Sequence, residues 1–245
     1  MATNSIKIVS WNVNGIQNVV KRYKILAHIR TLGSDIAMLQ ETHLKNEESL
    51  KLKQRWVGQV FSSPGGRGTK GVSILISKKI SFNLIDSVCD KEGRYLVLHG
   101  TLQNEKCTLV NIYAPNSAQA SFLSSLCTLL AKIVGSPIVL GGDFNLIKEA
   151  SLDRSGHPLP MDTSLSRAFK ELLESFGLVD VWRLLNPHSR EYTFYSKVHN
   201  SYSRIDYLLV SDSLIKNVIN AEIHSILISD HAPQPDSLLH GGMGA

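Results

Sequence analysis

Apolar runs of strand length recur along the whole chain, and they constrain its fold more than any other feature. The runs are rich in β-branched residues and are bounded by Gly, Pro, Asn, Asp or Ser, which is typical of strands. They cover residues 6–11, 36–39, 72–76, 95–99, 108–113, 138–140 and 205–210. Several of them follow one another without a helix between, so we expect an α/β fold with two mixed sheets packed face to face and helices outside.

Three segments between these runs have apolar residues at helical spacing, namely residues 19–32, 122–134 and 165–176. The first ends before Gly33 and the third before Gly177, and glycine is a common residue at the end of a helix. In the first helix the apolar stripe, which we expect to face the core, consists of Val19, Tyr23, Leu26, Ile29 and Leu32.

Length, composition and cysteine content limit the class of protein. A chain of 245 residues with 43% hydrophobic residues can form one large domain with a continuous core. Its net charge of +5 favours a polyanionic partner without identifying it. Cys89, Cys107 and Cys127 form no CxxC pair, so we expect reduced thiols in an intracellular compartment, with Cys107 and Cys127 buried. The chain shows neither a signal-peptide pattern nor a membrane-spanning run, so we expect no membrane association.

Polar residues gather at the ends of the predicted strands. The motif GGDFN places Asp143 and Asn145 directly after a buried strand. Such residues are either turn formers or functional groups delivered to the rim of a sheet, and the motif alone does not decide between them. The pattern recurs in SWNVNG with Asn12 and Asn14, LQETH with Glu41, NIYAPN with Tyr113 and Asn116, SRIDY with Asp206, and SDH with Asp230 and His231.

The residue types in these motifs favour metal-assisted chemistry. No serine or cysteine stands in a recognisable nucleophile motif, so a hydrolase of this kind has to activate water. Carboxylates and amides suit Mg²⁺ and a phosphate, whereas zinc calls for histidine or cysteine ligands at local spacing that the sequence lacks. Metal-assisted hydrolysis of a phosphodiester is therefore the favoured reaction class.

Taken in order, these six motifs resemble those of the endonuclease/exonuclease/phosphatase superfamily, which includes deoxyribonuclease I and the apurinic endonucleases of the exonuclease III type. Within it the chain is most similar to the endonuclease domain of LINE-type retrotransposons, through the stretches IQNVVKR, DKEGRY, LDRS, EYTFYS and SYSRIDY. The resemblance implies a four-layered α/β sandwich, and we expect it to occupy residues 1–233.

The resemblance also implies roles for the residues around the metal and the attacking water. Glu41 would hold the divalent metal, assisted by Asn12 and Asp230. Asp143 would orient and deprotonate the water, and Asn145 would bind the phosphate. The implied metal is Mg²⁺, with Mn²⁺ as a substitute.

The resemblance also implies that three further residues help to stabilise the negative charge of the phosphate. Asp206 would accept a hydrogen bond from one ring nitrogen of His231 and so favour the protonated ring. His231 and Tyr113 would then stabilise the negative charge that develops on the phosphoryl oxygens.

Substrate contacts separate the branches of the superfamily. Apurinic endonucleases usually have aspartate at the position of Asn14 and often tryptophan at that of Ser203, so both residues favour the LINE-type branch. Arg154, Thr193 and Ser203 match positions on surface loops near the DNA, with Arg154 reaching the duplex. Asn14 and Asn116 are further candidates for binding the substrate.

The function implied is a magnesium-dependent endonuclease that nicks double-stranded DNA and leaves a 3′-hydroxyl for a reverse transcriptase, which would belong to the same polyprotein. We expect it to act in the nucleus as a monomer. The alternatives are an apurinic/apyrimidinic endonuclease, an inactive copy that only binds nucleic acid, and a phosphatase acting on a small phosphoester.

The sequence after residue 233 departs from the superfamily. Residues 234–245 combine proline with a cluster of glycines where a last strand is expected, so they are predicted to form a disordered or aberrant tail. A missing strand would expose a sheet edge and weaken the support of His231.

Overall fold

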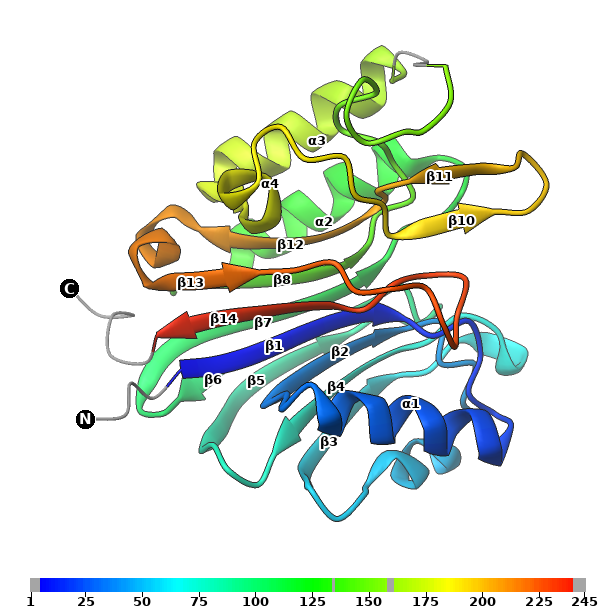
Figure 1. Cartoon of the computed structure of the whole chain (residues 1–245). Coiled ribbons are helices and arrows are strands. Elements are labelled where there is room, and N and C mark those ends of the chain that lie inside the picture. The colour runs from blue at the N-terminus through cyan, green and yellow to red at the C-terminus, as the bar shows by residue number, and fades with distance from the viewer. Residues whose placement is uncertain (1–4, 134, 158–160, 240–245) are drawn as a thin grey trace.

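Two mixed sheets of six strands each stack face to face (Figure 1). The computed structural model describes residues 5–133, 135–157 and 161–239. The strand order of the first sheet is β13 (Val218–Ala221), β14 (Gln234–Leu239), β1 (Ser5–Asn12), β2 (Ile36–Gln40), β4 (Val72–Ser77) and β3 (Val57–Ser63). That of the second is β5 (Phe82–Cys89), β6 (Tyr95–Leu102), β7 (Glu105–Tyr113), β8 (Ile138–Asp143), β12 (Asp206–Ser211) and β9 (Leu178–Asp180). A separate hairpin consists of β10 (Phe194–Ser196) and β11 (Ser201–Ser203).

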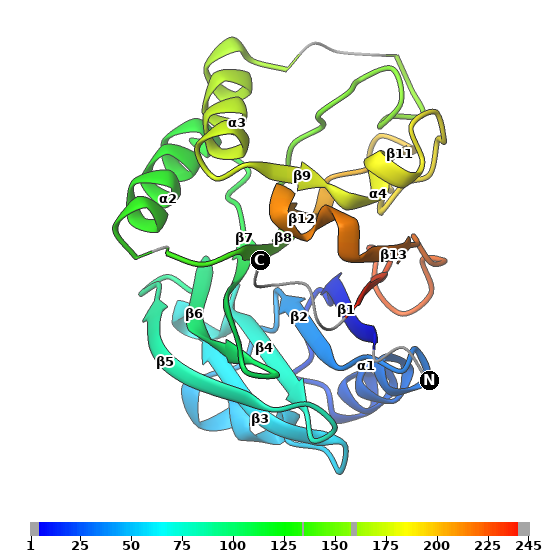
Figure 2. The same ribbon diagram turned by 90° about the vertical axis from the view of Figure 1, so that its left-hand side faces the viewer.

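Helices cover the outer faces of both sheets, which makes the fold four-layered, as the resemblance implied. Figure 2 shows α1 beside the first sheet and α2 and α3 together beside the second. The helices are α1 (Val19–Thr31), α2 (Gln119–Ile133), α3 (Thr163–Ser175) and the short α4 (Val181–Leu185). The 3-10 helices are η1 (Asn46–Leu52), η2 (Gly66–Gly68) and η3 (Asp212–Asn217). Residue 134, the last of the predicted second helix, lies outside the described residues.

Alternate residues of each strand enter different layers of the core, because successive side chains of a strand point to opposite faces. The core between the sheets includes Ile8, Met38, Ile74, Leu98, Leu109 and Leu208. The outward residues of the first sheet, such as Val9 and Leu39, pack against Ile25 and Ile29 of α1. Those of the second, such as Val110 and Leu209, pack against Leu126 of α2 and Leu172 of α3. This burial on both faces explains why the strands read as continuous apolar runs.

Helix α1 buries only part of the stripe that the spacing predicted. Its buried residues are Arg22, Ile25, Leu26 and Ile29. Val19 and Tyr23, by contrast, are 68% and 67% exposed. The guanidinium of Arg22 donates to the carbonyl oxygens of Ile16 and Gln17, both at 3.0 Å. Because these bonds satisfy the cation, Arg22 can occupy the inner face. Leu26 and Ile29 are buried as the spacing predicted, whereas Val19 and Tyr23 are left at the surface.

The expected disorder after residue 233 is wrong for residues 234–239, which form β14. This strand lies between β13 and β1 and pairs with β1 from Ser10↔Gln234 to Ser5↔Leu239. Pro235 is tolerated because an antiparallel strand uses only alternate N–H groups on each side, and its carbonyl accepts from the backbone N–H of Glu222 at 3.2 Å. The domain therefore extends past residue 233, while residues 240–245 lie outside the described residues.

All three cysteines are free, with Cys107 and Cys127 buried and Cys89 exposed. In the part of the chain that the structure describes, no helix has the length and apolarity needed to cross a membrane.

Candidate active site

A cavity of about 480 Å³ opens where the carboxyl ends of parallel strands meet. β1 and β2 run parallel in the first sheet, and β7 and β8 run parallel in the second. The four strands end at the same rim and bring together residues that are distant in the sequence. The cavity is lined by Asn14, Glu41, Tyr113, Asn116, Asp143, Asn145, Phe194, Ile205, Asp230 and His231.

The two glycines of GGDFN allow β8 to lie close to its neighbours. Gly142 has φ +155°, and a Cβ at this position would lie 2.2 Å from the carbonyl oxygen of Ile112 in β7. A Cβ at Gly141 would lie 2.7 Å from the Sδ of Met38 across the inner core. β8 can therefore pack tightly up to its last residue, Asp143, which pairs in register with Asp206, the first residue of β12.

His231 lies between the two buried aspartates, Asp143 and Asp206. Its Nδ1 is 2.8 Å from Oδ2 of Asp206, and its Nε2 is 3.8 Å from Oδ2 of Asp143. The ring of Phe194 packs against the imidazole at a centroid distance of 4.7 Å. The Nδ1–H therefore donates to Asp206, while Nε2 is directed toward the carboxylate that lines the cavity.

The charges of this trio favour a protonated imidazole. Burial lowers the pKa of His231, but the charge and hydrogen bond of Asp206 outweigh burial and raise this pKa to about 9. Burial, together with the charge of Asp206, raises the pKa of Asp143 above its usual value. At neutral pH His231 therefore carries a positive charge, and Asp143 is a stronger base than an ordinary aspartate.

Asn12 connects the carboxylates of the two sheets. Its Nδ2 donates to Oε1 of Glu41 and to Oδ2 of Asp143, both at 2.9 Å, and its Oδ1 accepts from the backbone N–H of Asn14 at 3.0 Å. Oε2 of Glu41 is 3.2 Å from Nε2 of His43. Although burial alone would raise the pKa of Glu41, hydrogen bonds from His43, Asn12 and Tyr113 lower it below its usual value. Glu41 is therefore ionised at neutral pH.

Asp230 is hydrogen-bonded to the side chain of Asn14. Its Oδ1 accepts from Nδ2 of Asn14 at 3.0 Å and from Oγ of Ser229 at 3.2 Å. The ammonium of Lys21 in α1 donates to the carbonyl oxygen of Asn14 at 2.6 Å. Burial lowers the pKa of Lys21, and the charges of Asp230 and Glu41 oppose this effect.

Asn145 and Tyr113 line the same cavity. The backbone N–H of Asn145 donates to Oδ1 of Asp143 at 2.9 Å, and its Nδ2 donates to the carbonyl oxygen of Ala114 at 2.8 Å. The guanidinium of Arg94 lies 5.0 Å from the ring centroid of Tyr113. Burial and the carboxylates of Glu41 and Asp143 raise the pKa of Tyr113, so its hydroxyl keeps its proton and can donate a hydrogen bond.

Four residues at or beside this rim have a left-handed backbone. Asn14, Glu41, His43 and Asn145 have φ angles of +42°, +50°, +56° and +51°, in the left-handed region that side-chain-bearing residues rarely adopt. Such strain occurs at functional sites, where the surrounding structure holds a side chain in a required direction.

Of the residues predicted to bind the substrate, Asn14 and Asn116 line the cavity, whereas Arg154, Thr193 and Ser203 do not. Arg154 and Ser203 form an isolated β-bridge beside it, and both are half-buried. Thr193 is fully buried, and its Oγ1 accepts from the backbone N–H groups of Ile205 and Asp206 at 3.1 and 3.2 Å. The expected surface position of Thr193 is therefore wrong, because its hydroxyl is needed at the start of β12.

The residues present fit a hard divalent cation. Glu41 offers an ionised carboxylate at the cavity wall, and the carboxylate of Asp230 lies at the same cavity. Oxygen ligands of this kind suit Mg²⁺ or Mn²⁺. Ligand atoms of Asp143, Asp206 and His231 also lie within 4.8 Å of one another. A protonated imidazole cannot coordinate a metal, however, and its hydrogen bond to Asp206 accounts for this second cluster.

Comparison with known proteins agrees with this geometry. The sequence profile of the endonuclease/exonuclease/phosphatase family matches residues 9–231. The chain belongs to this family. The resemblance carried by the six motifs is thereby confirmed.

Proteins similar in sequence to this chain include a transposon protein, an endonuclease and an exodeoxyribonuclease. The Transposon TX1 uncharacterized 149 kDa protein of Xenopus laevis is 32% identical over 93% of this chain, which spans 18% of that protein. The DNA-(apurinic or apyrimidinic site) endonuclease of Dictyostelium discoideum is 28% identical over 94% of this chain and 70% of the relative. The exodeoxyribonuclease of Bacillus subtilis is 27% identical over 93% of this chain and 97% of the relative.

Solved structures of other proteins share the fold. The apurinic endonuclease LMAP of Leishmania major has a TM-score of 0.77 and 21% identity, covering 97% of this chain and 88% of that chain. An apurinic endonuclease of Archaeoglobus fulgidus has a TM-score of 0.76 and 23% identity, covering 96% of this chain and 100% of that chain. The fold expected from the motifs is thus the observed one.

Some residues at the site were not assigned a role from the sequence. His43 contacts Glu41, Phe194 packs on His231, and Lys21 and Ser229 hold the turn with Asn14 and Asp230. His43 belongs to the motif LQETH and Ser229 to the motif SDH. Their positions beside Glu41 and Asp230 in the sequence could therefore have indicated that they lie at the site. Phe194 and Lys21 belong to EYTFYS and IQNVVKR, where nothing but the resemblance marks them.

Proposed function

We propose that this chain is a magnesium-dependent endonuclease that nicks double-stranded DNA and leaves a 3′-hydroxyl. One observation carries the proposal: the protonated His231, the basic Asp143 and the ionised Glu41 line a single cavity. A cation, a base and an anionic ligand for a metal are what hydrolysis of a phosphodiester by water requires. Relatives named as endonucleases and exodeoxyribonucleases support the choice of DNA.

In the proposed mechanism Asp143 accepts the proton of the attacking water. Its Oδ1 is held by the backbone N–H of Asn145 and its Oδ2 by Nδ2 of Asn12, so the carboxylate has a fixed orientation. The raised pKa of Asp143 makes it a better acceptor for that proton. Asn145 binds a phosphoryl oxygen beside the water. As the water oxygen bonds to phosphorus, the bond between phosphorus and the 3′-oxygen breaks, and the 3′-oxygen takes a proton from solvent to become the 3′-hydroxyl.

His231 and Tyr113 stabilise the charge that develops on the phosphoryl oxygens. Asp206 holds the ring through Nδ1, which leaves the Nε2–H of His231 to donate into the cavity. The Tyr113 hydroxyl, whose raised pKa keeps it protonated, donates to a phosphoryl oxygen in the same cavity. Removing one donor of this kind costs about 100- to 1000-fold in rate.

The metal-binding residues in this proposal are Glu41 and Asp230, with Asn12 positioning Glu41. When bound there, Mg²⁺, or Mn²⁺ as a substitute, would neutralise phosphate charge and polarise the P–O bond. Asn12 directs its Nδ2 to both Glu41 and Asp143, which sets the direction of the Glu41 carboxylate relative to the base.

Two branches of the family are candidates for the substrate. The transposon relative, together with Asn14 and Ser203, supports a retrotransposon endonuclease that acts on intact duplex. In that case the 3′-hydroxyl would prime a reverse transcriptase of the parent polyprotein, and the chain would work in the nucleus as a monomeric domain. The second candidate is an apurinic/apyrimidinic endonuclease, favoured by the names of several relatives.

Cleavage of matched duplexes distinguishes these candidates. An end-labelled duplex is incubated with the chain and Mg²⁺, in one arm intact and in the other with a single abasic analogue, and the products are offered to a DNA polymerase. The retrotransposon proposal predicts nicks in the intact duplex that the polymerase extends. Cleavage confined to the abasic position would support the repair enzyme, and products that cannot be extended would contradict a 3′-hydroxyl.

A further inference from the structure

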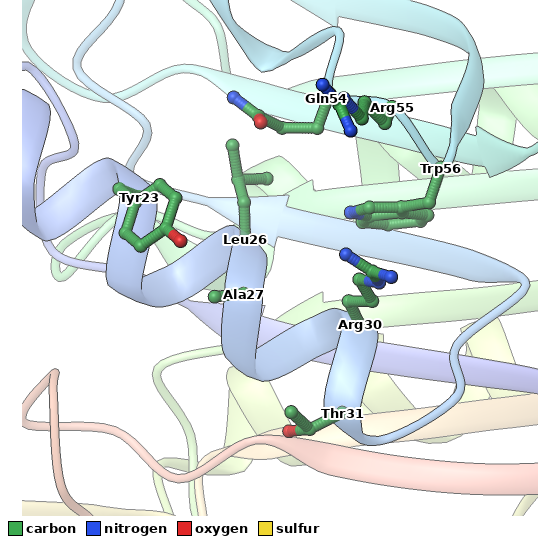
Figure 3. Close-up of a pocket in the computed structure, with 8 residues that line it drawn as sticks. All are labelled: Tyr23, Leu26, Ala27, Arg30, Thr31, Gln54, Arg55 and Trp56. Carbon is green, nitrogen blue, oxygen red and sulfur yellow. The ribbon is translucent and has the colours of Figure 1, made fainter.

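A second cavity of about 480 Å³ lies between α1 and the turn that leads into β3 (Figure 3). Its walls include Tyr23, Leu26, Arg30, Gln54, Arg55 and Trp56. None of its lining residues lines the active-site cavity. Helix α1 covers the outer face of the first sheet, so this hollow belongs to a different layer from the strand ends that carry the catalytic residues (Figures 1 and 2).

Trp56 forms a firmly held aromatic wall of this hollow. It is partly buried and packs against the core cluster beneath α1. Its carbonyl oxygen accepts from the backbone N–H of Lys78 at 2.9 Å, and the N–H of Val57 donates to the carbonyl oxygen of Gln54 at 3.0 Å. Trp11 and Trp182 are only 1% and 4% exposed. Trp56 is therefore the tryptophan whose ring a ligand can reach, and the backbone around it is fixed in advance.

The charges around the hollow are positive. Arg30 and Arg55 are exposed, and Figure 3 shows the guanidinium of Arg30 directed toward the Trp56 ring. Helix α1 contains no acidic residue. Among the residues that the structure describes, neither arginine takes part in an ion pair. The hollow therefore attracts an anionic ligand.

We propose that this hollow is a second nucleic-acid site that binds a single-stranded segment. An unpaired base would stack on Trp56, a neighbouring base would reach the exposed ring of Tyr23 at the other end of the hollow, and the adjacent phosphates would bind Arg30 and Arg55. The amide of Gln54 supplies both a donor and an acceptor for a base edge. A base inside a duplex has no free ring face to offer, so the site selects single strands.

The composition of the walls favours a nucleotide over an acidic peptide. The rings of Trp56 and Tyr23 and the amide of Gln54 match successive flat, polar bases, and the two arginines match the phosphates that join them. Leu26 is only 1% exposed, so the floor offers little apolar surface to an aliphatic side chain. The inference does not depend on the nuclease activity, since none of these residues takes part in the proposed mechanism.

Tryptophan fluorescence of the full chain tests the proposal. Short oligothymidylate is titrated in EDTA, which prevents cleavage, and in the presence of excess duplex, which occupies the active-site cavity. Stacking on Trp56 predicts saturable quenching, because the other two tryptophans are buried. A parallel titration with oligouridylate tells whether DNA or RNA is the preferred strand, and polyglutamate of equal charge tests for a peptide ligand.

Variants locate the binding by anisotropy of a labelled oligothymidylate. We expect Trp56→Ala to weaken binding roughly 5- to 100-fold and Trp56→Phe, which keeps a ring, to retain it. The double variant Arg30→Ala, Arg55→Ala should weaken binding at least about tenfold and flatten its salt dependence. Arg167→Ala, which removes an exposed arginine from α3, is the matched control and should bind like the wild type. Each of these variants should nick duplex DNA at the same rate as the wild type.

Three results would overturn the proposal. They are oligonucleotides that cause no quenching, an arginine double variant that binds as tightly as the wild type, and polyglutamate that competes as well as oligothymidylate. If Trp56→Ala fails to fold, the double variant decides the question, because both arginine side chains are exposed and their removal leaves the core intact.

Discussion

His231 donates from Nδ1 to Oδ2 of Asp206 over 2.8 Å, while its Nε2 lies 3.8 Å from Oδ2 of Asp143. The histidine thus lies between one aspartate that fixes its protonation and another that faces the reaction. The two aspartates pair in register across β8 and β12, so the sheet itself sets their separation. The predictions below follow from this arrangement and from the buried charges around it.

The first prediction concerns the pH at which nicking fails. The pKa of His231 is raised to about 9, so the imidazolium is present through neutral pH and is lost as pH rises through about 9. Asp206→Asn removes the negative charge that raises this pKa. We expect the alkaline fall in the nicking rate to move to lower pH in this variant, in addition to a lower maximal rate. The measurement is the nicking rate of the wild type and of Asp206→Asn at saturating Mg²⁺ over a range of pH. If the rate falls at the same alkaline pH in both proteins, the prediction is contradicted.

The second prediction concerns Asn12, which positions Glu41 without lining the cavity. Asn12→Ala removes the donor shared by Glu41 and Asp143, so the proposed metal ligand loses its fixed direction. Loss of such a supporting contact typically costs 10- to 100-fold in metal affinity or activity. We expect the Mg²⁺ concentration for half-maximal nicking to rise by about that factor. A variant with wild-type metal dependence would show that Asn12 does not support the metal site.

The third prediction concerns Asp236 in β14. Its carboxylate is buried, Oδ1 has no hydrogen-bond partner among the described residues, and burial raises its pKa well above the usual value. A raised folded pKa means that the neutral form stabilises the fold, and this contribution is lost as pH rises above the ordinary pKa of aspartate. We expect Asp236→Asn to raise the free energy of unfolding by about 1–3 kcal/mol at pH 7.

Urea unfolding at two pH values checks this change. The gain should be present at pH 7 and disappear near pH 4, where both the wild type and the variant are neutral at this position. Asp86→Asn, at an exposed position of β5, is the matched control and should change stability little at either pH. Equal stability of Asp236→Asn and wild type at pH 7 would contradict the account.

The fourth prediction concerns Arg204, which is 1% exposed. Its guanidinium bridges Asp153 and Asp180, and Asp153 also pairs with Arg183. Arg204→Met would leave buried carboxylates with unpaired charge, which typically destabilises a protein by about 3–5 kcal/mol. Urea unfolding should show a loss of this size, and Arg167→Met should show almost none. If Arg204→Met lowers the free energy of unfolding by less than about 1 kcal/mol, the ion-pair network contributes little to stability and the prediction is contradicted.

Much of the fold follows from local patterns in the sequence. The apolar runs located the strands that are buried on both faces, because continuous burial leaves a continuous apolar run. They missed β3 and β5, most of whose residues are not fully buried, and the short strands β9, β10, β11 and β13. They also missed β14. Proline and glycine predicted an irregular tail, and the sequence alone does not show that β1 has a free edge with which residues 234–239 can pair.

The site was only partly predictable for a similar reason. Motif order brought Glu41, Asp143, Asp206 and His231 to one region, and the structure places all four there. The burial of Thr193 could not be foreseen, since it depends on how the chain enters β12. The tail supports the site, because Nε2 of Gln234 in β14 donates to the carbonyl oxygen of Asp206 at 2.9 Å.

The most direct test of the central claim is nicking of supercoiled plasmid by the purified chain, with Mg²⁺ or with EDTA, beside the variants Asp143→Ala and His231→Ala. The account predicts metal-dependent conversion of supercoiled to open-circular plasmid, reduced about 100- to 1000-fold or more by either substitution in a folded protein. A folded wild-type chain that binds the plasmid but never nicks it, or a variant that nicks at the wild-type rate, would contradict it.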